Sequence, residues 1–127
     1  MNTDEREELN RLSAKVIGAA QKVSSLLGCG FLEKVYENAL AVELRSRALS
    51  VTQQSAITIR YEEAVVGEYF ADIVVDDRLI VELKTVKAFD PIHEAQCINY
   101  LRASGLHLCL LMNFARPRLD VRRIINT

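Results

Sequence analysis

The sequence predicts an α/β domain in which helices flank a mixed β-sheet, with elements in the order α-α-β-β-β-α-β. Two segments with helical apolar spacing come first, and three strand-like runs separated by turn residues follow them. A helix that begins at a proline then precedes a wholly apolar run. A chain of 127 residues suits one core, so we expect a single domain over residues 1–127.

The two N-terminal helices are predicted from apolar spacing and from signals at their ends. Residues from about Thr3 to Leu27 repeat apolar side chains at helical intervals, and Asn2 or Thr3 can cap this helix. Glycines 28 and 30 end it, because glycine suits a left-handed C-cap. A second helix with a broad apolar surface is expected from about Phe31 to Ala48.

Three strands are expected next, as an antiparallel meander. The alternation from Val51 to Tyr61 predicts a partly exposed strand, and a turn region lies between Glu62 and Gly67. Two apolar strands follow, from about Glu68 to Val75 and from Leu79 to Thr85. The dipeptide Asp76-Asp77 is expected to form the tight turn that joins them.

The C-terminal third predicts a helix and one or two strands. Asp90-Pro91 marks a helix start, and the helix should run to about Ala103. The apolar run from Leu106 to Met112 is typical of a strand buried on both faces. A right-handed crossover should make this strand parallel to the one before the helix. Val121 to Ile125 is a candidate for a last edge strand.

Composition excludes some classes of function. The net charge of −1 argues against a broad basic surface and mildly against a stand-alone DNA binder. No run of about 18 apolar residues is present, so no membrane span is expected. The segment Met1–Arg11 is charged and lacks the apolar part of a signal peptide, so we expect a cytoplasmic protein. The three cysteines are far apart and are expected to be inert free thiols.

Three ionisable residues interrupt the two strands that meet at Asp76-Asp77. Alternation places Glu82 and Lys84 on one face of the second strand with Ile80, and Asp72 on one face of the first with Phe70 and Val74. If the strands pair around the turn, Asp72 lies close to Glu82. Two carboxylates beside an ammonium group are costly to bury unless a metal or a substrate uses them.

This spacing suits metal-dependent hydrolysis. Mg²⁺ and Mn²⁺ prefer carboxylate and carbonyl oxygens, which Asp72, Glu82 and the Leu83 carbonyl could supply. A cation there would lower the pKa of a bound water, and Lys84 could orient that water or stabilise charge on a phosphate. The alternative is structural: two half-exposed strands with a Glu–Lys ion pair.

The predicted helices add further polar candidates. Gln96 and Tyr100 are four residues apart, with His93 one turn earlier, so they share a helical face that could point toward the acidic strands. Alternatively, His93 and Gln96 are solvated and Tyr100 is a core ring with a wet hydroxyl. Glu33 lies beside the apolar stripe of its helix or is an exposed acid favoured near a helix N-terminus. His107 is expected to be a hydrogen-bonded structural residue.

Several motifs, in a specific order, resemble the PD-(D/E)XK nuclease superfamily and, more closely, its small GxxExxY group. The resemblance covers the chain from about Ile17 to Ile125. The matching segments are Gly30-Phe31-Leu32-Glu33-Lys34-Val35-Tyr36, Gly67-Glu68-Tyr69-Phe70-Ala71-Asp72, Ile80-Val81-Glu82-Leu83-Lys84, His93-Glu94-Ala95-Gln96 through Tyr100-Leu101, Ser104-Gly105-Leu106 and Leu111-Met112-Asn113-Phe114.

The resemblance implies a restriction-endonuclease-like core and a Mg²⁺ or Mn²⁺ site. It implies that Asp72 and Glu82 bind the metal, that Glu33 joins them, and that Lys84 assists catalysis. Gln96 and Tyr100 match a helical Gln and Tyr that RecB-like members carry near the active centre. The proline of the superfamily name is absent, because Ala71 precedes Asp72, and the four-cysteine iron–sulfur arrangement of some relatives is absent too.

Three functions remain open from the sequence. The first is a Mg²⁺-dependent nuclease acting on nucleic acid, with DNA the expected substrate. The second is a non-catalytic interaction module on the same fold in a DNA repair or mobile-element complex, which the near-neutral charge favours. The third is a nuclease active only as a homodimer, because a chain of this size offers little surface to hold a duplex.

Overall fold

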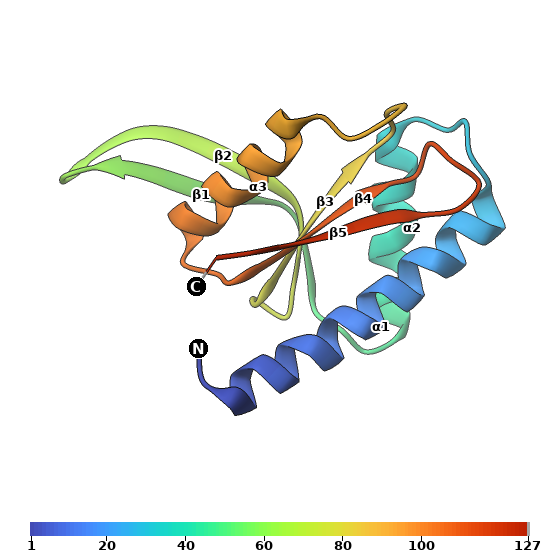
Figure 1. Cartoon of the computed structure of the whole chain (residues 1–127), viewed down its shortest axis with the longest axis horizontal. Helices are drawn as coiled ribbons and strands as arrows, with labels where there is room; N and C mark the ends of the chain where they lie inside the picture. Colours follow the sequence, from blue (N-terminus) through green and yellow to red (C-terminus); the bar gives the residue numbers. More distant parts are fainter. Residues whose placement is uncertain (127) are drawn as a thin grey trace.

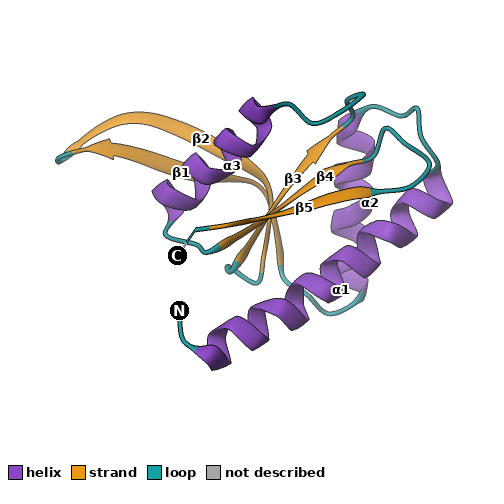
Figure 2. Cartoon of the chain, viewed as in Figure 1, coloured by secondary structure: helices purple, strands orange, loops and turns teal. Residues whose placement is uncertain are grey.

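The computed structural model describes residues 1–126 and contains three helices and five strands (Figures 1 and 2). The order confirms the predicted succession, with one further strand at the C-terminal end. The elements are α1 (Thr3–Leu27), α2 (Glu33–Ser46), β1 (Val51–Tyr61), β2 (Ala64–Val75), β3 (Leu79–Lys84), α3 (Pro91–Ser104), β4 (Leu108–Asn113) and β5 (Asp120–Ile125).

The strands form one mixed sheet in the order β1-β2-β3-β4-β5. Strands β1, β2 and β3 are an antiparallel meander, β3 and β4 are parallel, and β5 returns antiparallel to β4. The helix α3 makes the crossover between the two parallel strands, as the sequence predicts. The parallel pair lies at the centre of the sheet, where every residue of β4 is buried.

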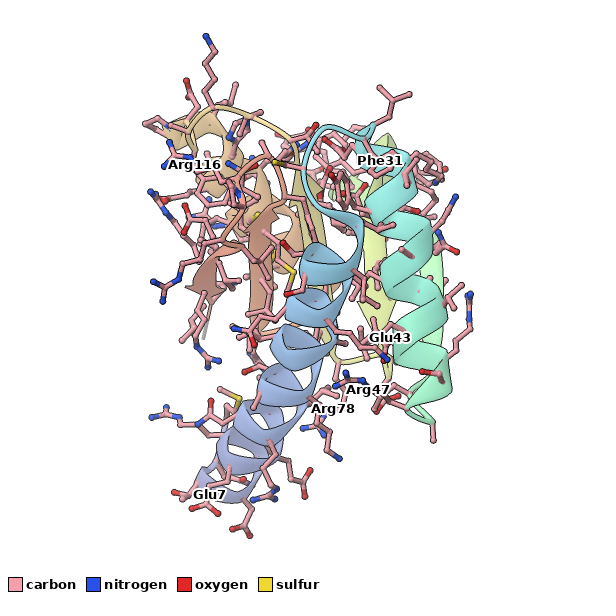
Figure 3. The ribbon with its side chains drawn as sticks, turned by 90° about the vertical axis from the view of Figure 1, so that its right-hand side faces the viewer. Glu7, Phe31, Glu43, Arg47, Arg78 and Arg116 are labelled. Atoms are coloured by element: carbon pink, nitrogen blue, oxygen red, sulfur yellow. The ribbon has the colours of Figure 1, made fainter. Side chains whose placement is uncertain are left out.

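Helices cover both faces of the sheet, and each face has its own apolar cluster. Helices α1 and α2 pack over one face, where Tyr36, Leu40 and Leu83 belong to the larger cluster. Figure 3 shows α1 and α2 side by side over this face. Helix α3 covers the other face, where Cys97 and Leu101 pack against Ile80. A residue of β2 or β3 can therefore be assigned to a face by the cluster it joins.

The predicted signals are found at the start of α1 and at both ends of α3, whereas α2 ends at Ser46 and Gly28 ends α1 without the left-handed helical conformation. The Asn2 side chain accepts a hydrogen bond from the Glu5 N–H at 2.8 Å and caps α1. Asp90 caps α3, and Gly105 ends it in the left-handed conformation. Helix α2 begins at Glu33 instead of Phe31 and has no side-chain cap. Glu33 is thus the first helical residue, at the positive end of the helix dipole.

Both hairpin connections are short, with three residues (76–78) between β2 and β3 and two between β1 and β2. Asp76 and Asp77 have φ of 51° and 54°, and the Arg78 N–H donates to the Val75 carbonyl, which defines a type I′ turn. Glu62 and Glu63 form the other turn, so β2 begins at Ala64 and not near Glu68 as expected. The resulting β1–β2 hairpin projects well beyond the rest of the sheet (Figure 1).

The alternation of β2 breaks at Asp72. Ala71 belongs to the α3-side cluster, whereas Ile73 belongs to the α1/α2-side cluster. The prediction that Phe70, Asp72 and Val74 line one face is therefore wrong. The physical reason lies in β1, where Gln54, opposite Asp72, adopts a φ of 51°. A left-handed residue within a strand rotates the residues after it, so both strands change the face that they present.

Candidate active site

Asp72 and Glu82 lie side by side where β2 and β3 separate. Counted from the turn, the regular pairing of the two strands ends at Ile73 and Val81, one residue before Asp72 and Glu82 are reached. Beyond it, the Asp72 N–H donates to Glu82 Oε1 at 2.9 Å, and the Leu83 N–H donates to Asp72 Oδ2 at 2.9 Å. The carboxylates thus replace the backbone acceptors that a continued ladder would supply. The predicted proximity of Asp72 to Glu82 is confirmed.

Burial makes the ionised forms of these carboxyl groups costly. Glu82 is only 3% exposed, and burial followed by the charge of Asp72 raises its pKa to about 9. Burial also raises the pKa of Asp72, against the lowering effect of the Leu83 N–H. Lys84 opposes both shifts but is a weaker influence than burial. The pair therefore lacks sufficient positive charge from the chain itself.

Lys84 continues the site toward α3. It follows Glu82 on the same face of β3, and its Nζ donates to Gln96 Oε1 at 3.4 Å. Gln96 Nε2 in turn donates to the Tyr100 hydroxyl at 2.9 Å. Burial raises the pKa of Tyr100, and the charges of Glu82 and Asp72 add to this rise. The predicted face of α3 thus points at the acidic strands and holds the lysine ammonium.

His93 does not belong to this chain of contacts. Its Nδ1 accepts a hydrogen bond from the Asp90 N–H at 3.0 Å, so the ring is part of the cap of α3. His107, which was predicted to be a hydrogen-bonded structural residue, contacts the Asn126 carbonyl oxygen through Nδ1 at 3.0 Å. Both histidines therefore have local structural partners.

Glu33 approaches the same carboxylates from α2. Burial raises its pKa, and the charge of Asp72 is the next cause, whereas Lys84 and the Thr85 N–H lower it. These influences place the Glu33 carboxyl within electrostatic reach of Asp72 and Lys84. Helix α2 supplies it from the α1/α2 side of the sheet, so the site collects residues from both faces.

Glu37 is a further buried acid beside the site, and its place there was not predicted. It lies one turn after Glu33, is 3% exposed, and accepts hydrogen bonds from Lys34 Nζ and Gln53 Nε2, each at 2.8 Å. Gln54 Nε2 donates to its other oxygen at 2.9 Å. The spacing of four residues from Glu33 was the available signal, because such residues share a helical face.

Gln54 connects the acids of α2 with those of β2. The same Nε2 that donates to Glu37 lies 3.3 Å from Asp72 Oδ1. Its left-handed backbone turns the side chain toward this position, and non-glycine residues adopt such a backbone only when their surroundings compensate. No sequence pattern marked Gln54, because the contact depends on how α2 packs against β1.

The donor set fits a hard divalent cation with few protein ligands. Within residues 1–126, no group of three or more His, Cys, Asp or Glu side chains is arranged to hold a metal ion. Mg²⁺ commonly uses one or two carboxylates and retains several waters. Backbone donors occupy Asp72 Oδ2 and Glu82 Oε1, so the candidate ligands are Glu82 Oε2 and Asp72 Oδ1, the latter at 3.3 Å from Gln54 Nε2. For Leu83, the structure shows its N–H at the site, and a role for its carbonyl stays a prediction.

The cysteines take no part in a disulfide. Cys29 is exposed, whereas Cys97 and Cys109 are buried, and all three are free thiols as predicted. A hydrogen bond to Cys97, followed by burial, raises the pKa of Cys109. Separately, none of the helices within residues 1–126 combines the length and apolar character needed to cross a membrane.

Comparison with known proteins identifies one family and one similar fold. Residues 10–124 match the family described as the PD-(D/E)XK nuclease superfamily. No curated protein matches the sequence significantly. A solved structure titled "Crystal structure of SSO0001" has a TM-score of 0.58 and 16% sequence identity, covering 73% of this chain and 49% of that one. The chain thus spans about half the length of that protein, and the likeness concerns the fold.

Proposed function

The chain belongs to the PD-(D/E)XK nuclease superfamily, and on this basis we propose that it is a Mg²⁺- or Mn²⁺-dependent nuclease that hydrolyses phosphodiester bonds. The observation that carries the proposal is the contact of Asp72 with Glu82, with Lys84 on the same face of β3 and held by Gln96. A structural ion pair would need no second carboxylate in this place.

The residues of the proposed site have different roles in this reaction. Asp72 and Glu82 would hold the cation, with Glu33 and the Leu83 carbonyl as further ligands, and the cation would supply a water of lowered pKa. Lys84 would orient that water and stabilise the charge that develops on the phosphate. Gln96 and Tyr100 would keep the ammonium in position. The buried surroundings strengthen each of these electrostatic effects.

We further propose that the chain belongs to the GxxExxY group, because the motif that gives this group its name forms the loop before α2 and the first turn of that helix. The Tyr36 hydroxyl donates to the Gly28 carbonyl at 2.6 Å and accepts from the Phe31 N–H at 3.3 Å. Tyr36 therefore holds the loop that leads to Glu33. Phe31, which is labelled in Figure 3, lies in this loop. The Tyr36 ring stacks on Phe114 with centroids 4.9 Å apart, and the Phe114 N–H donates to the Lys84 carbonyl.

Cleavage of labelled DNA and RNA in the presence of Mg²⁺ or Mn²⁺ tests the proposal. We expect Asp72→Asn, Glu82→Gln and Lys84→Met each to lower the rate by about a hundredfold or more. Asp77→Asn is the matched control, since Asp77 lies at the turn of the same β2–β3 hairpin and is exposed. Equal rates in the wild type and all three site variants would contradict the proposal.

The alternative is a non-catalytic interaction module on the same fold. The observation in its favour is that residues 1–126 contain no group of three or more potential side-chain ligands. Calorimetric titration with Mn²⁺ separates the two: metal binding that Asp72→Asn abolishes favours the nuclease. A lack of binding in the wild type favours the module.

Action on DNA as a homodimer is a further part of the nuclease proposal. Sedimentation with and without DNA would test it.

A further inference from the structure

A groove runs along α3 on the side that faces the β1–β2 hairpin. Its larger part, of about 840 Å³, lies between β1 and the C-terminal half of α3. Its smaller part, of about 330 Å³, lies over the N-terminal half of the helix. Both parts are lined by Tyr69 and Asn99, so they form one continuous depression, which we call the hairpin groove.

The hairpin groove leads to the candidate active site. Gln96 lines its smaller part, and the same side chain accepts the hydrogen bond from Lys84 Nζ. Gln96, Asn99 and Arg102 follow at intervals of three residues on α3 and lie on neighbouring positions of one helical face. They span roughly 9 Å at the rise of an α-helix, from the lysine to the far end of the groove.

The fixed charges of the hairpin groove are all positive. Arg60 and Arg102 line its larger part, and neither part is lined by an aspartate or a glutamate. Neither arginine forms a salt bridge with another residue in the range 1–126. In a chain of net charge −1, two uncompensated guanidinium groups beside an acid-free groove fit a phosphodiester backbone.

An aromatic ring accompanies these charges. Tyr69 is 45% exposed and rests on Tyr100, with ring centroids 5.6 Å apart and planes tilted by 52°. Exposed aromatic rings between cationic side chains are typical of surfaces that bind single strands, because unpaired bases can stack on them. The bases of a duplex are already stacked on one another and offer no face to Tyr69.

We propose that the hairpin groove binds single-stranded nucleic acid and leads it to the acidic site. Arg60 and Arg102 contact phosphates, and Tyr69 stacks on a base. Residues 56–60 of β1 line the groove, and β1 is an edge strand whose outer N–H groups are unpaired within the sheet. These groups supply further donors to phosphate. Only the direction toward the acidic site depends on the proposed nuclease function.

Fluorescence anisotropy with a short labelled oligothymidine, in EDTA and over a series of salt concentrations, tests the proposal without cleavage. We expect Arg60→Gln and Arg102→Gln each to weaken binding severalfold and to reduce the salt dependence by about 0.7 in the logarithmic slope. Tyr69→Leu should weaken binding about tenfold, whereas Tyr69→Phe should retain most of the affinity. A duplex of equal length should bind more weakly, and an oligouridine arm compares RNA with DNA.

Arg11→Gln is the matched control, because Arg11 is exposed on α1, on the opposite face of the sheet. It removes the same charge and should leave the affinity unchanged. The proposal is overturned if the groove variants bind like the wild type, if Arg11→Gln weakens binding equally, or if the duplex binds more tightly. The binding measurement is made in EDTA, without free divalent metal. A failure to cleave in Mg²⁺ would therefore contradict the proposed nuclease function but not the proposed binding of single strands.

Discussion

At the scale of single residues, Glu82 couples the site to the stability of the fold. Its carboxyl group is buried beside that of Asp72, and its pKa rises to about 9 from the ordinary 4.5. Between these pH values the unfolded chain has released the proton, whereas the folded chain keeps it. The folded state binds more protons, so stability is greatest below the unfolded pKa and declines as pH rises.

Denaturation in EDTA at several pH values measures this effect. The free energy of unfolding should fall from about pH 5 toward pH 9, by up to roughly 1.4 kcal/mol per pH unit for one proton. Glu82→Gln removes the titrating group and keeps an oxygen for the Asp72 N–H, so its profile should be flatter. A wild-type profile as flat as that of Glu82→Gln would show that Glu82 is ionised in the folded protein.

Tyr100 acts on Lys84 only through Gln96, which makes it a positioning residue. Tyr100→Phe removes the hydroxyl that accepts from Gln96 Nε2 and keeps the buried ring. We expect kcat to fall severalfold while KM changes little, because the ammonium is less well oriented. Loss of one hydrogen bond should cost about 1 kcal/mol of stability. Steady-state cleavage kinetics measure kcat and KM separately. The control is Tyr61→Phe, at the exposed end of the hairpin.

At the scale of elements, the β1–β2 hairpin depends on the backbone of Gln54. A left-handed backbone costs a residue with a Cβ roughly 1–2 kcal/mol, and the hydrogen bonds from Gln54 to Glu37 and Asp72 offset this cost. Alanine at position 54 would lose the hydrogen bonds and keep the strain, whereas glycine would lose both. Gln54→Gly should therefore be more stable than Gln54→Ala by about 1 kcal/mol.

Urea denaturation of four variants tests this inversion. In ordinary strand backbone, glycine is less stable than alanine by roughly 0.5–1 kcal/mol. The neighbouring Gln53 has no positive φ, so Gln53→Gly should be less stable than Gln53→Ala and provides the matched pair. The account of Gln54 is wrong if both positions show the same order.

The elements that could be predicted are those whose signals are local. The ends of α1, the start of α3 at Pro91 and the turn at Asp76-Asp77 follow from capping and turn chemistry within a few residues. The early start of β2 was missed, because Gly67 was interpreted as the end of the turn region that begins at Glu62, whereas it lies within the strand. The reversal of faces at Asp72 was missed as well, since it arises from Gln54 on the neighbouring strand.

At the scale of the whole molecule, the site joins both layers of helices across one end of the sheet. The proximity of Asp72 to Glu82 could be predicted because a short connection at Asp76-Asp77 keeps the two strands close to hairpin register, and the observed pairing of Ile73 with Val81, continued by one residue, brings Asp72 to Glu82. The position of Gln96 followed from the spacing on α3. The inclusion of Glu33 rested on resemblance, and Glu37 was missed. Both depend on how α2 packs across the sheet, which one sequence does not reveal.

Because the site spans these layers, a bound cation should stabilise the whole domain. Free ligand at about 100 times its dissociation constant adds roughly 2.7 kcal/mol, which for a domain of this size raises Tm by about 8 °C. Thermal melts with Mn²⁺ against EDTA should show this rise in the wild type and in Asp77→Asn. Asp72→Asn and Glu82→Gln should lose it. An equal rise in all four proteins would mean that the cation binds elsewhere, because only the first two retain both acids where β2 and β3 separate.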